Sequence, residues 1–266
     1  MKSKAQKNKI LIILPTLGQR TDFLRKTLDS IKLQKPVNYD LVMIFPKNSK
    51  ETESLAKEFG AIIVEDHGKG LSSAVNEGLK QLKPIHKYFS WIGDDDLLSE
   101  KSLHNSQKAL EENGEAVVAF GYCDYINNAG EKLFTNRTGN LAPWIMTWGP
   151  NLMPCPGTLF RCSAVKEAGQ FDVNNKYSMD LDMFLRLRKL GKFINTKKTL
   201  AAFRWHSSST TVANRKAVLK ETESVKRKYL PKYLQTIAPI WEYPVRIATK
   251  LAVIRVNKLS NLNGIN

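Results

Sequence analysis

The sequence predicts an α/β fold in which helices flank a mostly parallel central sheet, followed by a basic, helical C-terminal extension. The sheet is predicted because short apolar runs alternate with amphipathic segments from residue 9 to residue 122. The extension is predicted from charge. Residues 1–182 carry 23 Lys or Arg and 22 Asp or Glu, a net charge of +1, whereas residues 183–266 carry 18 and 3, a net charge of +15.

Each element follows from a local pattern. Residues 9–14 are a continuous apolar run suited to a buried parallel strand. Residues 22–33 repeat apolar side chains, among them Leu24, Leu28 and Ile31, at the spacing of one helix face. By the same criteria we expect four more strands, at 39–45, 61–64, 88–92 and 116–122, and three more helices, at 49–59, 71–82 and 99–112.

The alternation ends near residue 125. Residues 126–158 are rich in Gly, Pro, Asn and Trp and are predicted to be loop. Regular structure is expected to return as a helix over 178–190, which Gly191 would end, and as a strand over 199–205.

The tail is expected to be helical from residue 213 onward, with breaks at Pro231, Pro239 and Pro244. We therefore assign a domain to residues 1–212, with halves at 9–125 and 126–212, and an extension to residues 213–266.

Composition excludes several classes of protein. The 42% hydrophobic content is that of a globular chain rather than a disordered one. Three cysteines are too few for a disulfide scaffold or a four-ligand zinc site, which favours a reduced, cytoplasmic location. The apolar run before Pro15 is too short for a signal peptide, and no run of about 18 apolar residues predicts a membrane-spanning helix.

Three consecutive aspartates, Asp94, Asp95 and Asp96, directly follow the predicted strand at 88–92. Ligands of parallel sheets bind at the carboxyl ends of strands, so this position favours a site. Three adjacent carboxylates repel one another unless a cation neutralises them, and oxygen-rich sites suit Mg²⁺ or Mn²⁺. The alternative is an acidic turn that favours the positive N-terminal end of the next helix.

Two more aspartates, Asp180 and Asp182, begin the helix predicted at 178–190. An ionised carboxylate can serve as a general base. The local alternative is that both stabilise the helix N-terminus, with Asp182 pairing with Arg186 one turn later.

Two weaker features accompany the aspartates. His206 follows the predicted strand at 199–205, and a lone histidine is more often a hydrogen-bonded structural residue than a metal ligand. Lys69 stands between two glycines before the helix at 71–82, where a helix N-terminus can receive phosphate, although no Walker or GxGxxG pattern is present.

Four segments, in this order, resemble the family 2 glycosyltransferases, whose fold is the Rossmann-like GT-A fold. ILIILPTLGQRTDFLRKTLDSIKLQ resembles the family's first strand, Pro-Thr turn and first helix, and WIGDDDLLSEKSL its metal-binding Asp-x-Asp segment. CPGTLFRCSAVKEAGQFDVNNKYSMDLDMFLRLRKLGKF is similar to its acceptor-side segment, and FRWHSSSTT to the stretch that closes the site. The resemblance covers about residues 9–210.

The resemblance implies a role for each matching residue. Asp180 falls at the catalytic base, with Asp182 as the fallback. The donor and its divalent cation (Mn²⁺ or Mg²⁺) would be held by the remaining site residues: Pro15, Thr16, Arg20, Asp94 and Asp95 at the nucleotide-sugar, Asp96 and His206 at the metal, and Lys69 or Arg204 as fixed donors near the diphosphate.

Two departures from the family pattern stand out. The second strand of the family usually ends in an acidic turn that contacts the nucleotide base, but residues 44–49 read IFPKNS. The identity of the base is therefore open. Gly93 also occupies a place that is often acidic in the family.

The resemblance implies an inverting, hexosyltransferase-type reaction. A sugar would pass from a nucleotide-diphospho-sugar to the hydroxyl of a glycan or lipid-linked acceptor, in cell-surface polysaccharide or glycolipid synthesis; no nucleic acid partner is expected. A sugar nucleotidyltransferase would need a Gly-rich phosphate loop after the first strand, which ILPTLGQR lacks. The remaining alternative is a non-catalytic basic module that binds a membrane or another polyanion.

The C-terminal tail contains a segment whose pattern accounts for its positive charge. From residue 245 onward a helix would place one set of apolar side chains together: Val245, Ala248, Ala252, Val256 and Leu259. Such a helix suits the surface of an anionic leaflet, so the protein would be peripheral on the inner face of the cell membrane. The alternative is a helix packed on the protein's own core.

Overall fold

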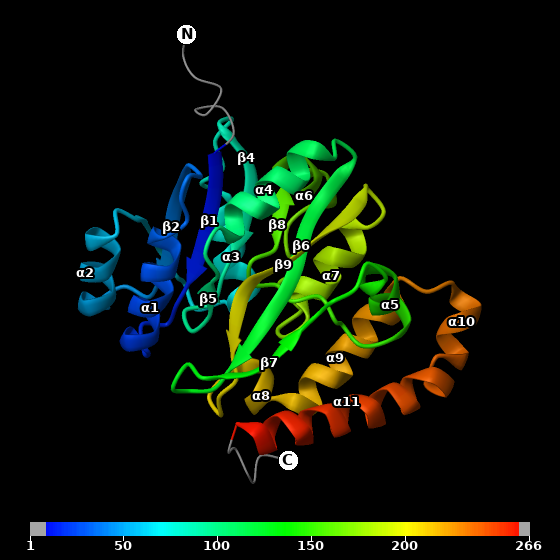
Figure 1. Ribbon diagram of the computed structural model, residues 1–266. Helices are drawn as coiled ribbons and strands as arrows, with labels where there is room; N and C mark the ends of the chain where they lie inside the picture. The colour runs from blue at the N-terminus through cyan, green and yellow to red at the C-terminus, as the bar shows by residue number, and fades with distance from the viewer. Residues whose placement is uncertain (1–8, 261–266) are drawn as a thin grey trace.

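The structure, a computed structural model, describes residues 9–260. Nine strands form one sheet in this part of the chain, with helices on both faces (Figure 1). The strands are β1 (Lys9–Pro15), β2 (Tyr39–Phe45), β3 (Ile62–Glu65), β4 (His86–Trp91), β5 (Leu97–Leu98), β6 (Ala116–Ile126), β7 (Lys132–Asn136), β8 (Leu159–Arg161) and β9 (Lys192–Arg204).

The sheet is mixed but largely parallel. Its strand order is β3-β2-β1-β4-β8-β6-β9-β5, and β7 pairs with β6 outside this path. The strands β3, β2, β1 and β4 run parallel, as do β6 and β9. The short strand β8 is antiparallel to its neighbours β4 and β6, and β5 is antiparallel to β9. The predicted fold class is thus confirmed, with antiparallel additions at β5, β7 and β8.

Alternate residues of β1 supply two cores. Ile10, Ile12 and Leu14 pack with helices on one face, whereas Leu11 and Ile13 pack with helices on the other, and all five are buried. The first layer contains α1 (Thr21–Lys32), α2 (Lys50–Glu58) and α4 (Ser102–Glu112), and the second contains α3 (Leu71–Leu79), α5 (Ala142–Trp148), α6 (Cys162–Ala168) and α7 (Met179–Leu187). Burial on both faces explains why β1 reads as an unbroken apolar run.

Several predicted elements need correction. The segment at 126–158 is not all loop, because it contains β7 and α5. The strand expected at 199–205 begins at Lys192, where it pairs with β6. Helix α7 ends at Leu187, so Gly191 does not end it. Gly191 instead allows a close approach of two chain segments, since a Cβ there would lie 2.6 Å from the Glu115 carbonyl oxygen.

The extension consists of α8 (Thr210–Ala213), α9 (Arg215–Lys228), α10 (Lys232–Ile237) and α11 (Pro239–Leu259). The expectation that Pro244 interrupts the helical structure is wrong, because α11 continues through it. Helix α9 packs on α7, and Figure 1 shows α11 lying below α9 and β7. The boundary at residue 212 stays a prediction, and residues 261–266 of the predicted extension lie outside the described part. Among the described residues, no helix combines the length and apolarity needed to cross a bilayer.

Candidate active site

The three consecutive aspartates lie where β1 and β4 end. These strands pair in parallel, so the residues that follow them share one edge of the sheet. Thr16 and Arg20 follow β1, and Asp94 to Asp96 follow β4. Gly93 leaves space at this turn, because a Cβ on it would lie only 3.0 Å from the Asp95 Oδ1 atom. An acidic side chain at this position would therefore crowd the carboxylate that the turn presents.

The Arg20 guanidinium bridges the first two aspartates. Its Nη2 donates to Asp94 Oδ1, and its Nη1 donates to Asp95 Oδ2 at 2.7 Å. The Thr16 hydroxyl donates to the other oxygen of Asp94 at 2.5 Å. Burial raises the pKa of Asp94, and the bonds from Thr16 and Arg20 oppose that rise only in part. Arg20 thus neutralises much of the repulsion that the sequence predicted.

His206 completes this arrangement from the end of β9. Its Nε2 lies 2.9 Å from Asp95 Oδ2 and 3.3 Å from Arg20 Nη1, and its Nδ1 lies 2.9 Å from the Ser208 hydroxyl. Burial acts to raise the pKa of Asp95, but the hydrogen bond with His206 and the charge of Arg20 outweigh it and lower that pKa. Asp95 is therefore held as a carboxylate.

Asp96 differs from its two neighbours. Its Oδ1 accepts the backbone N–H of Arg204 at 3.0 Å, and no basic side chain among the described residues binds its carboxylate. Burial, and then the charge of Asp95, raise the pKa of Asp96 well above its ordinary value. A bound cation would remove this cost, so Asp96 is the carboxylate of the three best suited to a metal.

Arg204 is fully buried and engaged elsewhere. Its Nε donates to the Asp95 carbonyl oxygen at 2.9 Å, and its Nη1 donates to the carbonyl oxygens of Asn127 and Asn128 at 3.1 Å. Its guanidinium also stacks 4.5 Å from the centre of the Phe23 ring. Arg204 thus holds the aspartate turn against a neighbouring loop, and its expected role as a fixed donor near the diphosphate stays a prediction.

Asp180 lies half-buried in the first turn of α7, and its Oδ1 accepts the N–H of Leu181 at 2.7 Å. Burial raises the pKa of Asp180 to about 6, against the opposing backbone hydrogen bonds and with a further contribution from the charge of Glu221. The charge of Asp180 also acts on the buried thiol of Cys155. Burial, followed by the charges of Asp180 and Asp96, raises the pKa of Cys155, so both carboxylates act on one thiol.

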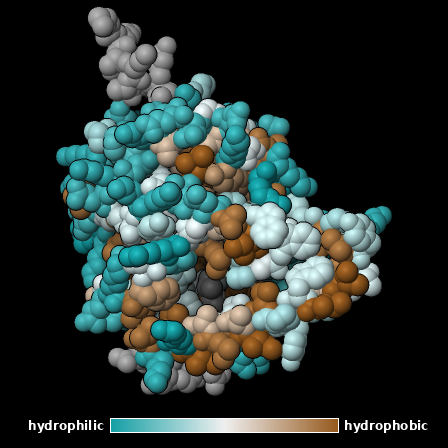
Figure 2. Space-filling view, turned by 45° about the vertical axis from the view of Figure 1, so that its right-hand side comes forward, coloured by the Kyte–Doolittle hydropathy of each residue, from teal (hydrophilic) through white to brown (hydrophobic). Residues whose placement is uncertain are grey.

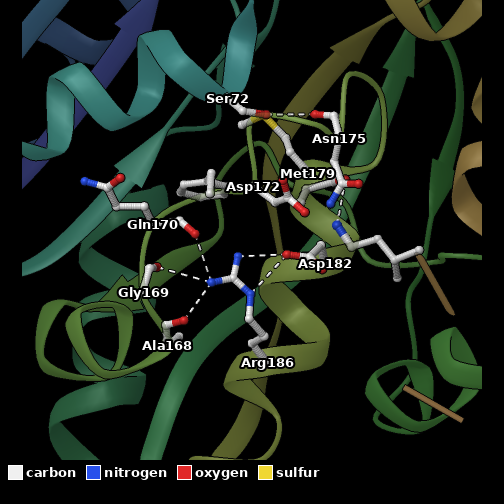
Figure 3. A network of polar contacts seen from close by, with 12 residues as sticks. Ser72, Ala168, Gly169, Gln170, Asp172, Asn175, Met179, Asp182 and Arg186 are labelled. Carbon is white, nitrogen blue, oxygen red and sulfur yellow. Dashed lines mark hydrogen bonds and ion pairs between the residues drawn. The ribbon is translucent and has the colours of Figure 1, made fainter. Parts of the chain in front are cut away.

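Asp182, the fallback base, has a structural role. Its Oδ2 accepts a hydrogen bond from Arg186 Nε at 3.0 Å and lies 2.8 Å from Arg186 Nη2 in an ion pair, and its Oδ1 accepts the Tyr229 hydroxyl at 2.7 Å. Figure 3 shows the Arg186 guanidinium between Asp182 and the carbonyl oxygens of residues 168–170, to which it also donates. Both carboxylate oxygens are occupied, so the pairing of Asp182 with Arg186 is confirmed, and in this arrangement Asp182 has no free oxygen to act as a base.

Two predicted site residues contribute differently. Pro15 ends β1 opposite Ile44 of β2, and the N–H of the next residue, Thr16, donates to the Ile44 carbonyl oxygen at 2.9 Å. Lys69 is exposed in the loop before α3, and it makes no hydrogen bond or ion pair with any other residue between 9 and 260. The structure thus brings Thr16, Arg20, the aspartates and His206 together but leaves Lys69 outside their contacts.

Sequence reasoning missed Glu221 of α9. Its carboxylate accepts the backbone N–H groups of Lys176, Tyr177 and Ser178, at 3.0, 2.7 and 2.7 Å, and so holds the segment that leads to Asp180. The adjacent Thr222 hydroxyl lies 2.9 Å from that of Ser178. No local pattern signals this contact, because more than 40 residues separate the partners.

The chain belongs to glycosyl transferase family 2, whose model matches residues 11–167. The matched range includes the aspartate turn and excludes Asp180 and His206. Among relatives, an uncharacterized glycosyltransferase of Rickettsia prowazekii is 25% identical over 228 residues, which cover 79% of this chain and 68% of that protein. The family assignment confirms the resemblance that the motifs suggested and favours an enzyme over a non-catalytic basic module.

Solved structures of S. aureus TarS have a similar fold. TarS 1–349 in complex with UDP matches with a TM-score of 0.62 and 13% identity, over 85% of this chain and 68% of that one. TarS 1–349 in complex with UDP-GlcNAc matches with a TM-score of 0.61 and 12% identity, over 83% and 71%. The chain spans 42% of a longer TarS structure. At this level of identity the likeness concerns the fold alone.

Proposed function

We propose that the protein transfers a sugar, with inversion, from a nucleotide-diphospho-sugar to an acceptor hydroxyl. Family membership supports sugar transfer, and the UDP-GlcNAc that a TarS structure holds supports a nucleotide-linked donor. The observation that carries the proposal is the carboxylate cluster where β1, β4 and β9 end: Arg20 and His206 contact Asp95, and Asp96 has no basic partner among the described residues. Asp180, half-buried on α7, supplies a separate carboxyl whose pKa is raised by burial.

The donor is proposed to lie against Thr16, Arg20, Asp94 and Asp95. Arg20 already fixes both carboxylates, so they form a rigid acceptor surface for the ribose hydroxyls while the guanidinium partly offsets their charge. Lys69 is not fixed by any bond within the described residues, so its long side chain is free to meet the diphosphate. The base remains open, because residues 44–49 supply no carboxylate for it.

Asp96 is the proposed main ligand of a divalent cation, Mn²⁺ or Mg²⁺. Its buried carboxylate has one backbone partner and no basic one among the described residues, which suits a cation shared with phosphate oxygens. His206 would join Asp96 only by exchanging its contact with Asp95 for the metal. When bound, the cation stabilises the negative charge of the departing diphosphate as a Lewis acid.

Asp180 is the proposed general base. A carboxyl with a pKa of about 6 is mostly ionised at neutral pH yet more basic than an exposed aspartate. It takes the proton from the acceptor hydroxyl as that oxygen forms a bond to the anomeric carbon and the bond from that carbon to the diphosphate breaks. Attack from the face opposite the leaving group inverts the configuration.

The proposed acceptor is a glycan hydroxyl in a cell-surface polysaccharide or a glycolipid, and the transferred group is a hexose. A lipid-linked acceptor would place the reaction at the cytoplasmic face of the cell membrane. No nucleic acid has a part in this scheme.

A thermal-shift experiment with UDP, GDP and dTDP, each with and without Mn²⁺, tests the donor half. We expect one nucleotide to raise the unfolding temperature in a Mn²⁺-dependent way, because binding to the folded state alone stabilises it. Asp96→Asn serves as the matched control and should lose the Mn²⁺ dependence. The absence of a shift with any nucleotide, at concentrations that shift a known family member, would contradict the proposal.

A further inference from the structure

Helix α11 is fixed to the protein along one face. Near its start, the ring of Trp241 contacts that of Trp148 in α5, with centroids 5.7 Å apart. Near its end, Asn257 Oδ1 accepts the Nε1–H of Trp205 at 2.9 Å. Glu242 between these points is buried and paired with Arg227 of α9. The side chains that hold α11 thus all lie on its inner face.

The opposite face of α11 carries an unpartnered row of large apolar side chains, which we call the outer stripe. Its members recur at the spacing of one helix face and are 45–73% exposed: Ile240, Tyr243, Ile247, Leu251 and Ile254. Figure 2 shows hydrophobic residues along the lower and right-hand parts of the face it presents, where Figure 1 places α10 and α11.

The sequence predicted a different apolar face for this helix. Of that face, Val245 and Val256 are half-buried against the protein, whereas Ala248, Ala252 and Leu259 are exposed, so the packing alternative holds only in part. The pattern alone could not assign the faces, because α11 is apolar on both sides and only the contacts of Trp241 and Asn257 decide which one packs.

The charged side chains around the outer stripe indicate which kind of partner it would bind. Lys250, Arg255 and Lys258 are exposed at its sides and end, and none of them pairs with an acidic residue in the described chain. The acidic residues of the extension are engaged elsewhere: Glu221 by backbone N–H groups, Glu223 by Arg246 and Glu242 by Arg227. The stripe is therefore apolar at its centre and positive at its margins.

We propose that the outer stripe of α11 binds the surface of an anionic lipid leaflet. A helix of 21 residues, about 32 Å long, would lie in the plane of the interface, with the stripe among the acyl chains and the basic side chains at the headgroups. A second copy of this chain is a poorer partner, because two such stripes would bring like charges together. The proposal rests on α11 alone and does not depend on sugar transfer.

The position of α11 relates the lipid surface to the active site. Trp205, which Asn257 holds, directly precedes His206 of the aspartate cluster. A leaflet that contacts the outer stripe would thus lie on the side of the molecule where β9 ends.

Co-sedimentation of the full chain with phosphatidylcholine vesicles, with or without phosphatidylglycerol, tests the proposal. We expect binding only to the anionic vesicles and weaker binding in high salt. The variant Ile247→Gln/Leu251→Gln/Ile254→Gln should reduce the partition coefficient at least about tenfold. The single variants Lys250→Gln, Arg255→Gln and Lys258→Gln should each reduce it roughly fivefold. Gln is a good helix former, so α11 should remain helical.

A matched control replaces exposed apolar residues elsewhere, as Leu33→Gln/Leu141→Gln/Val173→Gln, and should bind as the wild type does. Equal sedimentation of the outer-stripe variant and the wild type would overturn the proposal. Failure of the wild type to bind anionic vesicles would also overturn the proposal. This includes the outcome in which the wild type does not bind vesicles but forms a dimer in light scattering, and the outer-stripe variant is a monomer. Circular dichroism confirms that each variant is folded.

Discussion

Replacing Asp180 with Asn should remove activity and stabilise the protein at the same time. Burial raises the pKa of Asp180 from an ordinary 3.8 to about 6, which means that the folded state disfavours the ionised carboxylate. Each pKa unit corresponds to about 1.4 kcal/mol, so ionised Asp180 costs about 3 kcal/mol of folding free energy. Asn is neutral, has the same shape and can still accept the Leu181 N–H.

The sign of the pH dependence follows from linkage. A carboxyl whose pKa is raised on folding binds its proton more tightly in the folded state, so its contribution to stability is lost as the pH rises from about 4 to about 6. Relative to the wild type, Asp180→Asn should gain about 1.5 kcal/mol near pH 5 and about 3 kcal/mol near pH 8. At about 2–4 °C per kcal/mol, calorimetry should show a higher unfolding temperature that levels off above pH 7.

Activity should respond in the opposite direction. Loss of a general base typically costs about 10²–10⁴-fold in rate, so Asp180→Asn should retain at most about a hundredth of wild-type turnover while still binding nucleotide. In the wild type, kcat/KM should fall with decreasing pH below about 6, where Asp180 becomes protonated. Turnover above about a tenth of wild type would refute the assignment as base, and a variant less stable at pH 8 would refute the burial argument.

Asp182→Asn provides the matched control two residues away. It removes the negative charge opposite Arg186, and breaking a buried pair of this kind costs about 3–5 kcal/mol. This variant should be less stable, whereas each folded molecule should keep much of its activity. The two substitutions thus separate a catalytic carboxylate from a structural one by opposite effects on stability.

Three further substitutions test the surroundings of the site. Glu221→Gln should lower the pKa of Asp180, and with it the acid limb of kcat/KM, because it removes a nearby negative charge; an unchanged pH profile would argue against this coupling. Arg20→Lys should weaken nucleotide binding in titration calorimetry by about tenfold, since Lys cannot bridge two carboxylates in a planar fork, and equal affinity would contradict that role. Asp96→Asn should abolish the Mn²⁺ dependence of nucleotide binding, whereas an unchanged titration would exclude Asp96 as the metal ligand.

The N-terminal half of the fold could be predicted because its signals are local. Strands such as β1 and β2 are buried on both faces, so nearly all of their residues are apolar and the sequence alone indicates their burial. β7 could not be found in this way. Its residues are exposed or half-buried, and it exists only because it pairs with β6. The first half of β9 contains the exposed residues Lys192, Lys197 and Lys198, and it could not be predicted for the same reason.

The aspartate turn could be predicted from its place after β4, but its partners could not. Arg20 and His206 are 186 residues apart, and they meet only because β1 and β9 bring their ends to the same edge. The local residue pattern could not distinguish Asp180 from Asp182, although the family resemblance ranked Asp180 first. Two positions apart on a helix, they point in nearly opposite directions, and only Tyr229 and Arg186 fix which one faces inward as a structural group.

The extension also contacts the segments around Asp180 and His206, which affects how the proposed lipid binding should be tested. Glu221 holds the segment before Asp180, Tyr229 binds Asp182, and Asn257 binds Trp205 beside His206. Deleting residues 237–266 would remove the outer stripe but would also free Trp205 and expose Trp148. Lost activity or lost vesicle binding in such a truncation would not identify its cause, whereas substitutions confined to the outer stripe leave every one of these inner contacts in place.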